Sequence, residues 1–290
     1  MTALQVLSTG PLATVQDSGR PGFAHLGVPH SGAADRTSFG LANRLVGNRE
    51  SAAAIEVTLG GLRLRADADI LVAVTGALTT VSVNGSPVGL AVGTTLRAGD
   101  ELSVGTPRQG CRNYVAIRGG VDVPPTLGSR STDTLSGLGP MPLRAGDELP
   151  VGAEVDDWPA IAAAPADGTI HQVTVLRYSP GPRAGHADDP ELLRRGLWQV
   201  GADSNRVGIR LARRADSEFG ALRHRLDAAE LRSEGIAHGS VQLPPGGNPV
   251  IFLADHPVTG GYPVIAVLDA AAADLAAQLT PGSTVRFRNR

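Results

Sequence analysis

Residues 54–76, AIEVTLGGLRLRADADILVAVTG, decide the fold that we expect for this chain. They contain three strand-like runs, at 54–59, 62–66 and 69–76, which are separated only by short breaks. The whole chain of 290 residues carries 37 glycines and 21 prolines but only 3% aromatic residues. That mixture favours many short strands and turns over long helices, so we expect a mainly β protein.

Further strands and a few helices follow on both sides of this stretch. Residues 81–88, VSVNGSPV, are typical of a hairpin because Asn84-Gly85 suits a tight turn. Residues 34–48 are expected to form a helix that Asp35 caps and Gly47-Asn48 ends. Other strands are expected at 111–119, 172–182 and within 240–269, with a short helix running into a strand at 190–200, a helix at 270–279 and a closing strand after it.

One motif recurs along the chain. LRAGDELSVG at 96–105 returns as LRAGDELPVG at 143–152, and LTPGSTVRF at 279–287 is a looser third version. Gly-Asp between apolar runs is a turn signal. We therefore interpret each copy as a turn that enters a strand of a barrel or sandwich.

The chain is long enough for two domains. Residues 153–170 are rich in Ala, Pro and Asp and form the expected linker, and the strand at 172–182 echoes residues 4–11. We expect a mostly β N-terminal domain at 1–160 and a β C-terminal domain at 161–290, with an N-terminal strand that can exchange between them.

Composition excludes several classes of function. Apolar residues make up 42% of the chain and charged residues 19%, and the net charge is −2, so no basic field points to nucleic acid. We see no signal peptide and no apolar run of the ~20 residues that a membrane helix needs. Cys111 is the single cysteine, which suits a reducing, cytoplasmic compartment.

The chain contains no lysine, since all 26 basic residues are arginine. This excludes a P-loop lysine, a Schiff-base lysine, the lysine of a Ser-Ser-Lys amidase and a biotinylated lysine. The seven histidines form neither HExxH nor HxH, so we expect no metal site. Neither a GxSxG elbow nor a GxGxxG loop after a strand is present.

Polar, glycine-rich loops carry the candidate site. They lie at 16–36, 118–132, 203–211 and 233–263, where loops that flank strands can meet at one end of a barrel. Arginine forks suit planar carboxylates or amides, and side-chain amides can donate to and accept from an amide substrate. The alternative is structural, because Asp and Asn beside glycine usually stabilise turns.

Several stretches together resemble one known family. They are TVQDSGRPGFAHLGVPHSGAADR, ANRLVGN with AIEVTLGG, GGVDVP with LGSRST, SNRVGIRL, SEGI with GSVQLP, and LADHPVTGGYP, in this order over nearly the whole chain. In these motifs the chain resembles the allophanate hydrolase subunit 2 family, also called KipA-like, which includes the C subunit of bacterial 5-oxoprolinase and the module that forms half of the carboxyltransferase domain of urea carboxylase.

The resemblance implies two cyclophilin-like β-barrel or sandwich domains with a few short helices. It implies an enzyme subunit of an ATP-dependent complex that opens the lactam of 5-oxoproline to glutamate. Expected partners are a KipI-like subunit 1, a LamB/YcsF-like subunit and a small amide or lactam substrate. We expect no covalently bound cofactor: the complex uses ATP, and biotin enters only on a separate carrier.

Two alternatives stay open. The chain could be the carboxyltransferase component of a urea-carboxylase-type enzyme, or a non-catalytic KipA-like regulator that binds a KipI-like kinase inhibitor. Without lysine, it is not a Ser-Ser-Lys amidase by itself. His256-Pro257 departs from the family pattern, where a more polar pair is commoner, and it does so in a suspected site loop.

We expect Gln16, Asp17 and Arg20 to form one wall of the site, and Asn205 and Arg206 to orient a carboxyl or amide group. The catalytic candidates are Asp17, Arg20 and Asp255, with Asp255 as the general base. The substrate-binding candidates are Gln16, Ser131, Thr132, Asn205, Arg206, Gln242 and Thr259.

Overall fold

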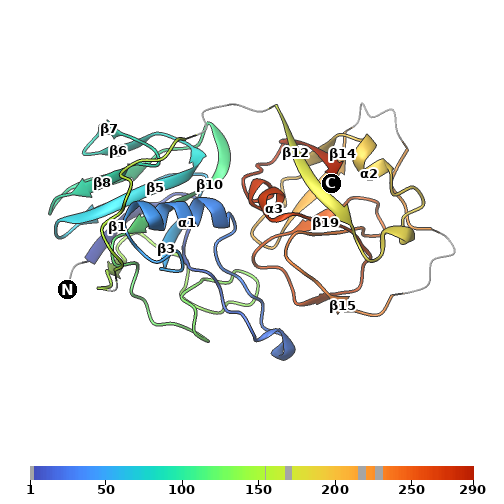
Figure 1. Ribbon diagram of the computed structural model, residues 1–290, viewed down its shortest axis with the longest axis horizontal. Helices are drawn as coiled ribbons and strands as arrows, with labels where there is room; N and C mark the ends of the chain where they lie inside the picture. The colour runs from blue at the N-terminus through green and yellow to red at the C-terminus, as the bar shows by residue number, and fades with distance from the viewer. Residues whose placement is uncertain (1–2, 154, 167–171, 215–219, 226–230) are drawn as a thin grey trace. The chain divides into compact units, whose positions relative to one another are not determined.

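The computed structural model describes residues 3–153, 155–166, 172–214, 220–225 and 231–290, which belong to two compact units. The first unit takes in residues 1–20, 31–133 and 137–170, and the second takes in 21–30, 134–136 and 171–290. The prediction of a mainly β protein with barrel and sandwich parts and few helices is confirmed (Figure 1).

Two antiparallel sheets make up the first unit. The six-stranded sheet has the order β11-β1-β4-β9-β6-β7, and the five-stranded sheet has the order β2-β3-β10-β5-β8. The bounds are β1 Ala3–Thr9, β2 Leu12–Gln16, β3 Ala54–Thr58, β4 Leu62–Ala66, β5 Ile70–Leu78, β6 Val81–Val83, β7 Ser86–Val88, β8 Gly93–Leu96, β9 Glu101–Val104, β10 Gln109–Ile117 and β11 Glu148–Pro150.

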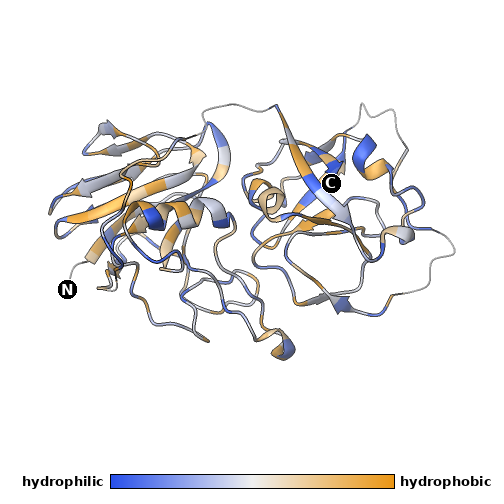
Figure 2. Cartoon of the chain, in the orientation of Figure 1, coloured by the Kyte–Doolittle hydropathy of each residue, from blue (hydrophilic) through white to orange (hydrophobic). Residues whose placement is uncertain are grey.

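The strands at 54–76 place their side chains as a sandwich requires. In β4, Leu62 and Leu64 are buried in a core shared with strands of the other sheet, while Arg63 and Arg65 are exposed and pair with Glu101 of β9. By contrast, four of the five residues of β3 are buried. Figure 2 shows the hydrophobic colour along much of β5, which lies in the same sheet as β3.

A helix covers the outer face of the five-stranded sheet. It is α1, Arg36–Leu45, which packs Phe39 and Leu45 into a second core with Tyr114 of β10 (Figure 1). Asp35 caps it as predicted, since its side chain accepts a hydrogen bond from the Ser38 N–H at 2.9 Å. This cover explains why β3 and β10 are buried on both faces.

The recurring motif forms the same turn three times. In the first copy the Arg97 N–H donates to the Asp100 carboxylate at 2.8 Å, and the Asp100 N–H donates back to the Arg97 carbonyl at 2.9 Å. Arg144 and Asp147 repeat this pair before β11, and Thr280 and Ser283 form a hydroxyl version before β20. The predicted role as a turn that enters a strand is confirmed for every copy.

A closed barrel makes up most of the second unit. Its strand order is β12-β19-β16-β17-β14-β13-β20, and β20 closes the ring by pairing parallel to β12. The bounds are η1 Ala24–Leu26, β12 Val173–Pro180, η2 Ala184–His186, α2 Leu192–Arg195, β13 Trp198–Val200, β14 Gly208–Arg213, β15 Glu234–Gly235, β16 Ser240–Gln242, β17 Val250–Phe252, β18 Thr259–Gly260, β19 Val264–Leu268, α3 Ala270–Ala277 and β20 Thr284–Asn289.

The stretch expected to be a linker, 153–170, is partly attached to the first unit. The Ala164 N–H donates to the Ala91 carbonyl at 2.9 Å, and the Gly93 N–H donates to the Ala162 carbonyl at 2.8 Å. These bonds place residues 162–164 along the edge at β8. Residues 154 and 167–170 of this stretch lie outside the described residues.

Candidate functional site

Asp17 lies at the centre of a hydrogen-bonded cluster in the first unit. Its Oδ1 accepts from the hydroxyls of Ser129 and Ser131, both at 2.6 Å, and from the Gly19 N–H at 2.8 Å. Its Oδ2 accepts from the Arg130 N–H at 2.5 Å. With four donors, this buried carboxylate ties the end of β2 to the loop at 129–131.

The two predicted neighbours of Asp17 reach the same loop. The Gln16 side chain donates to the Thr132 carbonyl at 2.9 Å, and Arg20 Nη2 donates to the Ser131 carbonyl. The structure therefore brings together the five predicted residues of the first unit. They are Gln16, Asp17, Arg20, Ser131 and Thr132, and all five are buried.

Some polar atoms of these five residues lack a hydrogen-bond partner among the described residues. Gln16 Oε1, Thr132 Oγ1, and both Nε and Nη1 of Arg20 are buried without a hydrogen-bond partner among the described residues. Buried polar atoms in folded proteins are nearly always paired, so a concentration of such atoms in one cluster needs an explanation.

The second unit holds a buried ion pair between two predicted residues. Arg206 donates from Nε to Asp255 Oδ2 at 2.8 Å and from Nη2 to Oδ1 at 2.9 Å, while the Thr134 N–H and hydroxyl donate to Oδ2 at 2.9 and 2.7 Å. Arg206 and Asp255 are 1% and 0% exposed. The bidentate geometry is the strongest form of this contact.

These contacts also set the pKa of Asp255. Burial would raise the pKa of this carboxyl, but the Arg206 charge and the hydrogen bonds from Arg206 and Thr134 outweigh it, so the pKa lies below its usual value. A carboxylate that is less basic and already paired is a weak proton acceptor. The general-base role stays a prediction, and the geometry gives Asp255 a positioning role in its loop.

The other three predicted residues of the second unit have surroundings different from those of this ion pair. They are Asn205, Gln242 and Thr259. Asn205 accepts from the Val207 N–H at 2.8 Å, as a turn residue does. Gln242 is buried and donates to the Tyr262 carbonyl at 2.9 Å. Thr259 is exposed on the short strand β18 and lines a pocket.

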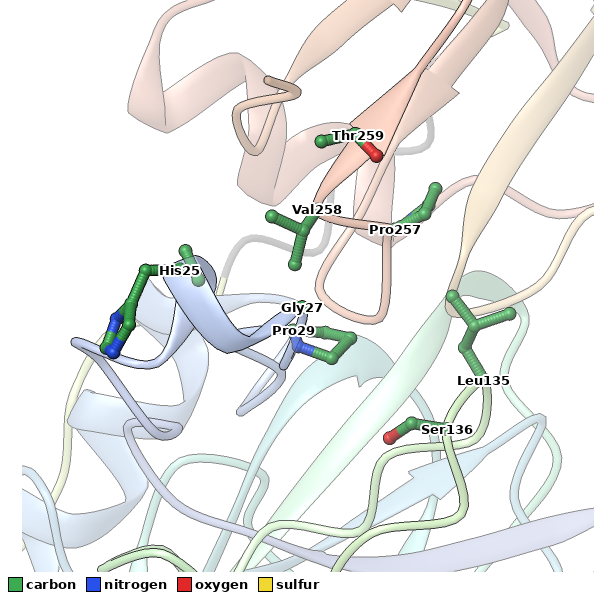
Figure 3. Close-up of a pocket in the computed structure, with 9 residues that line it drawn as sticks. His25, Gly27, Pro29, Leu135, Ser136, Pro257, Val258 and Thr259 are labelled. Atoms are coloured by element: carbon green, nitrogen blue, oxygen red, sulfur yellow. The ribbon is translucent and has the colours of Figure 1, made fainter. Parts of the chain in front are cut away.

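This pocket has a volume of about 470 Å³ (Figure 3). Three loops of the second unit line it, contributing Ala24, His25, Gly27 and Pro29, then Leu135 and Ser136, then Pro257, Val258 and Thr259. Its side chains are mainly apolar, with His25, Ser136 and Thr259 as the polar groups. Sequence reasoning found Thr259 but missed the apolar lining, whose only signal is Leu135, Pro257 and Val258 within polar loops.

Two further statements hold for the part of the chain that the structure describes. No group of three or more His, Cys, Asp or Glu side chains is placed to hold a metal ion in that part of the chain. No helix in the same residues is both long and apolar enough to cross a membrane.

Comparison with known proteins identifies the family. The model of the carboxyltransferase domain, subdomains A and B, matches residues 26–289. This chain belongs to the carboxyltransferase domain family. The match spans both the sandwich and the barrel, so the family assignment rests on nearly the whole fold.

Curated relatives and solved structures agree with this assignment. The C subunit of the 5-oxoprolinase of Escherichia coli is 35% identical over 291 residues, which cover 98% of this chain and 90% of that protein. The urea amidolyase of Lachancea kluyveri is 32% identical over 98% of this chain, but only 17% of that protein is covered. The crystal structure of TTHA0988 matches with a TM-score of 0.87 and 34% identity, over 99% of this chain and 56% of that one.

Proposed function

We propose that this chain is the carboxyltransferase-domain subunit of a 5-oxoprolinase-type complex. In this proposal the complex uses ATP to open the cyclic amide of 5-oxoproline to glutamate, in the cytoplasm. The observation that carries it is the alignment with the C subunit of the E. coli 5-oxoprolinase, which covers 98% of this chain and 90% of that protein. This alignment supports a similar role in such a complex.

The proposal assigns ATP handling to a partner, since this lysine-free chain has no P-loop lysine. The expected partners are the KipI-like and LamB/YcsF-like subunits. The chain would contribute by orienting a small amide with the polar cluster around Asp17, whose four hydrogen bonds fix the loop at 129–131. Positioning of this kind needs no nucleophile from the chain itself.

A second candidate is carboxyl transfer of the urea-carboxylase type. The family model and the urea amidolyase relative favour it. The carboxyl group would then arrive on a biotin attached to a separate carrier, because this chain has no lysine to attach it to.

The test is reconstitution of the complex from purified subunits. We expect glutamate formation from 5-oxoproline and ATP only when this chain and both partners are present. A complex that turns over urea and bicarbonate with a biotin carrier, and leaves 5-oxoproline unchanged, would instead support carboxyl transfer. A complex that assembles but turns over neither substrate would favour a regulatory role.

A further inference from the structure

Arg20 is a buried cation with most of its hydrogen-bonding capacity unused. It is 1% exposed, and among the described residues its Nη2 donates to the Ser131 carbonyl. Its Nε and Nη1 have no partner among the described residues. Since Nε carries one N–H and Nη1 carries two, at least three of the five guanidinium donors are unpaired among the described residues.

A buried guanidinium whose N–H donors are unpaired is costly unless a counter-charge or water balances it. Arginine stays protonated in proteins, so it cannot escape the cost of burial by losing its charge. No carboxylate of the described residues lies within the 4.0 Å of an ion pair with Arg20. The nearby carboxylate of Asp17 is occupied by its own four donors. Such a group is expected to be met by an anion or by ordered water.

Two atoms close to Arg20, also without a partner among the described residues, indicate which kind of ligand would fit beside it. Gln16 Oε1 is an acceptor with no partner among the described residues, and Thr132 Oγ1 is a hydroxyl with none there. Gln16 and Arg20 donate to the consecutive carbonyls of Thr132 and Ser131, so these side chains lie along one segment. A ligand with a carboxylate and an N–H group offers a partner to Arg20 and to Gln16.

The backbone packs closely around the Arg20 guanidinium. A Cβ on Gly139 would lie 2.0 Å from the Ser131 carbonyl oxygen and 3.1 Å from Arg20 Nη2, so only glycine fits there. The chain reaches the surface directly after Arg20, since Pro21 and Gly22 are exposed.

We propose that Arg20, with Gln16 and Thr132 beside it, forms a buried subsite for a small carboxylate. For its natural ligand this inference rests on the proposed function, because 5-oxoproline carries both a carboxylate and a lactam N–H. Urea carries no charge for Arg20 to meet. Binding of 5-oxoproline without binding of urea would therefore favour the first candidate function.

The experiment measures binding to the full-length chain. Formate, 5-oxoproline, urea and inorganic phosphate are each titrated at constant ionic strength, and the rise in unfolding temperature gives the apparent Kd. We expect formate and 5-oxoproline to stabilise the wild-type chain, with 5-oxoproline binding more tightly and urea having no specific effect. Arg20→Gln is expected to weaken binding by about tenfold or more, because the charged partner of the carboxylate is lost.

Arg63→Gln is the matched control, since it removes an exposed arginine of the same unit. It should bind as the wild type does. If Arg20→Gln does not fold, Arg20→Lys keeps the charge but loses the planar fork, and we expect weaker binding of 5-oxoproline by about fivefold.

Stabilisation by phosphate alone would overturn the carboxylate assignment. No stabilisation by any probe would mean that only water meets Arg20, and an equal effect in Arg20→Gln would place the binding elsewhere; either result rejects the subsite. Binding without turnover by the reconstituted complex would reject the proposed function while the subsite stands, and turnover without binding at Arg20 would do the reverse.

Discussion

Arg20 in the sandwich and Arg206 in the barrel unit are both 1% exposed, yet their surroundings differ. Arg206 makes a bidentate ion pair with Asp255, and Thr134 completes the hydrogen bonding of that carboxylate. Arg20 donates to one carbonyl and has two nitrogens unpaired among the described residues. The two arginines are therefore equally buried but differ in the pairing of their donors.

The two buried aspartates differ from Arg20, because their hydrogen bonding is complete. Asp17 and Asp255 were both catalytic candidates, and each is surrounded by donors from its own unit. A carboxylate with all its acceptor capacity in use holds loops in place. We therefore expect the aspartates to position the site and Arg20 to meet the ligand.

The largest effect is expected from Arg206→Gln. This change leaves Asp255 buried without its charged partner, which typically costs about 3–5 kcal/mol of unfolding free energy. Urea unfolding measures the loss. The matched control is the double variant Arg206→Met with Asp255→Leu, which removes both charges and should recover most of the stability. A loss below about 1 kcal/mol in the single variant would contradict the structural role.

Asp17→Asn comes next. It replaces an acceptor of four hydrogen bonds with an amide that presents a donor to the loop, so we expect a loss of about 2 kcal/mol. Asp122→Asn is the control, since Asp122 is exposed and paired with Arg130 at the surface, and should cost less than about 1 kcal/mol. Equal losses of unfolding free energy in the two variants would contradict the central structural role of Asp17.

Acid should reduce the stability that the Arg206–Asp255 ion pair contributes. We expect this loss of unfolding free energy to be smaller than that caused by Asp17→Asn. Because the pKa of Asp255 is lowered in the folded chain, the unfolded chain takes up a proton at a higher pH. The pair thus contributes its full stability above the ordinary carboxyl pKa, and that contribution is lost as the pH falls through the folded value. Unfolding measured over a pH series should show a smaller acid loss in the double variant Arg206→Met, Asp255→Leu than in the wild type. Identical slopes would contradict the assignment.

Arg20→Gln should have the smallest effect on the free chain. The variant loses one hydrogen bond to the Ser131 carbonyl but also removes an unpaired buried charge, so the two changes offset one another to within about 1 kcal/mol. Urea unfolding without added carboxylate checks this. A loss as large as that of Arg206→Gln would show that Arg20 is structural too.

Local patterns predicted much of the fold. The Asp35 cap, the Asn84-Gly85 turn and the three copies of the recurring turn depend on residues close in the chain, and each forms as expected. The attachment of residues 162–164 to the edge at β8 was not predicted, because backbone pairing between distant segments leaves no mark in an Ala-rich sequence.

The site was predicted only in part, for a similar reason. The polar loops pointed to Gln16, Asp17, Arg20, Ser131 and Thr132, and the fold brings these together. Sequence could not show which polar atoms are satisfied, since Asp17 and Arg20 are both polar residues within two positions of Gly19. Ser129 was missed although it binds Asp17, and its only signal was the Ser-x-Ser spacing.

The most direct test of the contrast between the two arginines is a proton–nitrogen NMR titration of their Nε–H signals with 5-oxoproline. The Arg20→Lys and Arg206→Gln variants assign the two signals by their loss. We predict that the Arg20 signal shifts and saturates while the Arg206 signal stays in place. An unmoved Arg20 signal at saturating 5-oxoproline, or a shift of Arg206 in its place, would contradict this prediction.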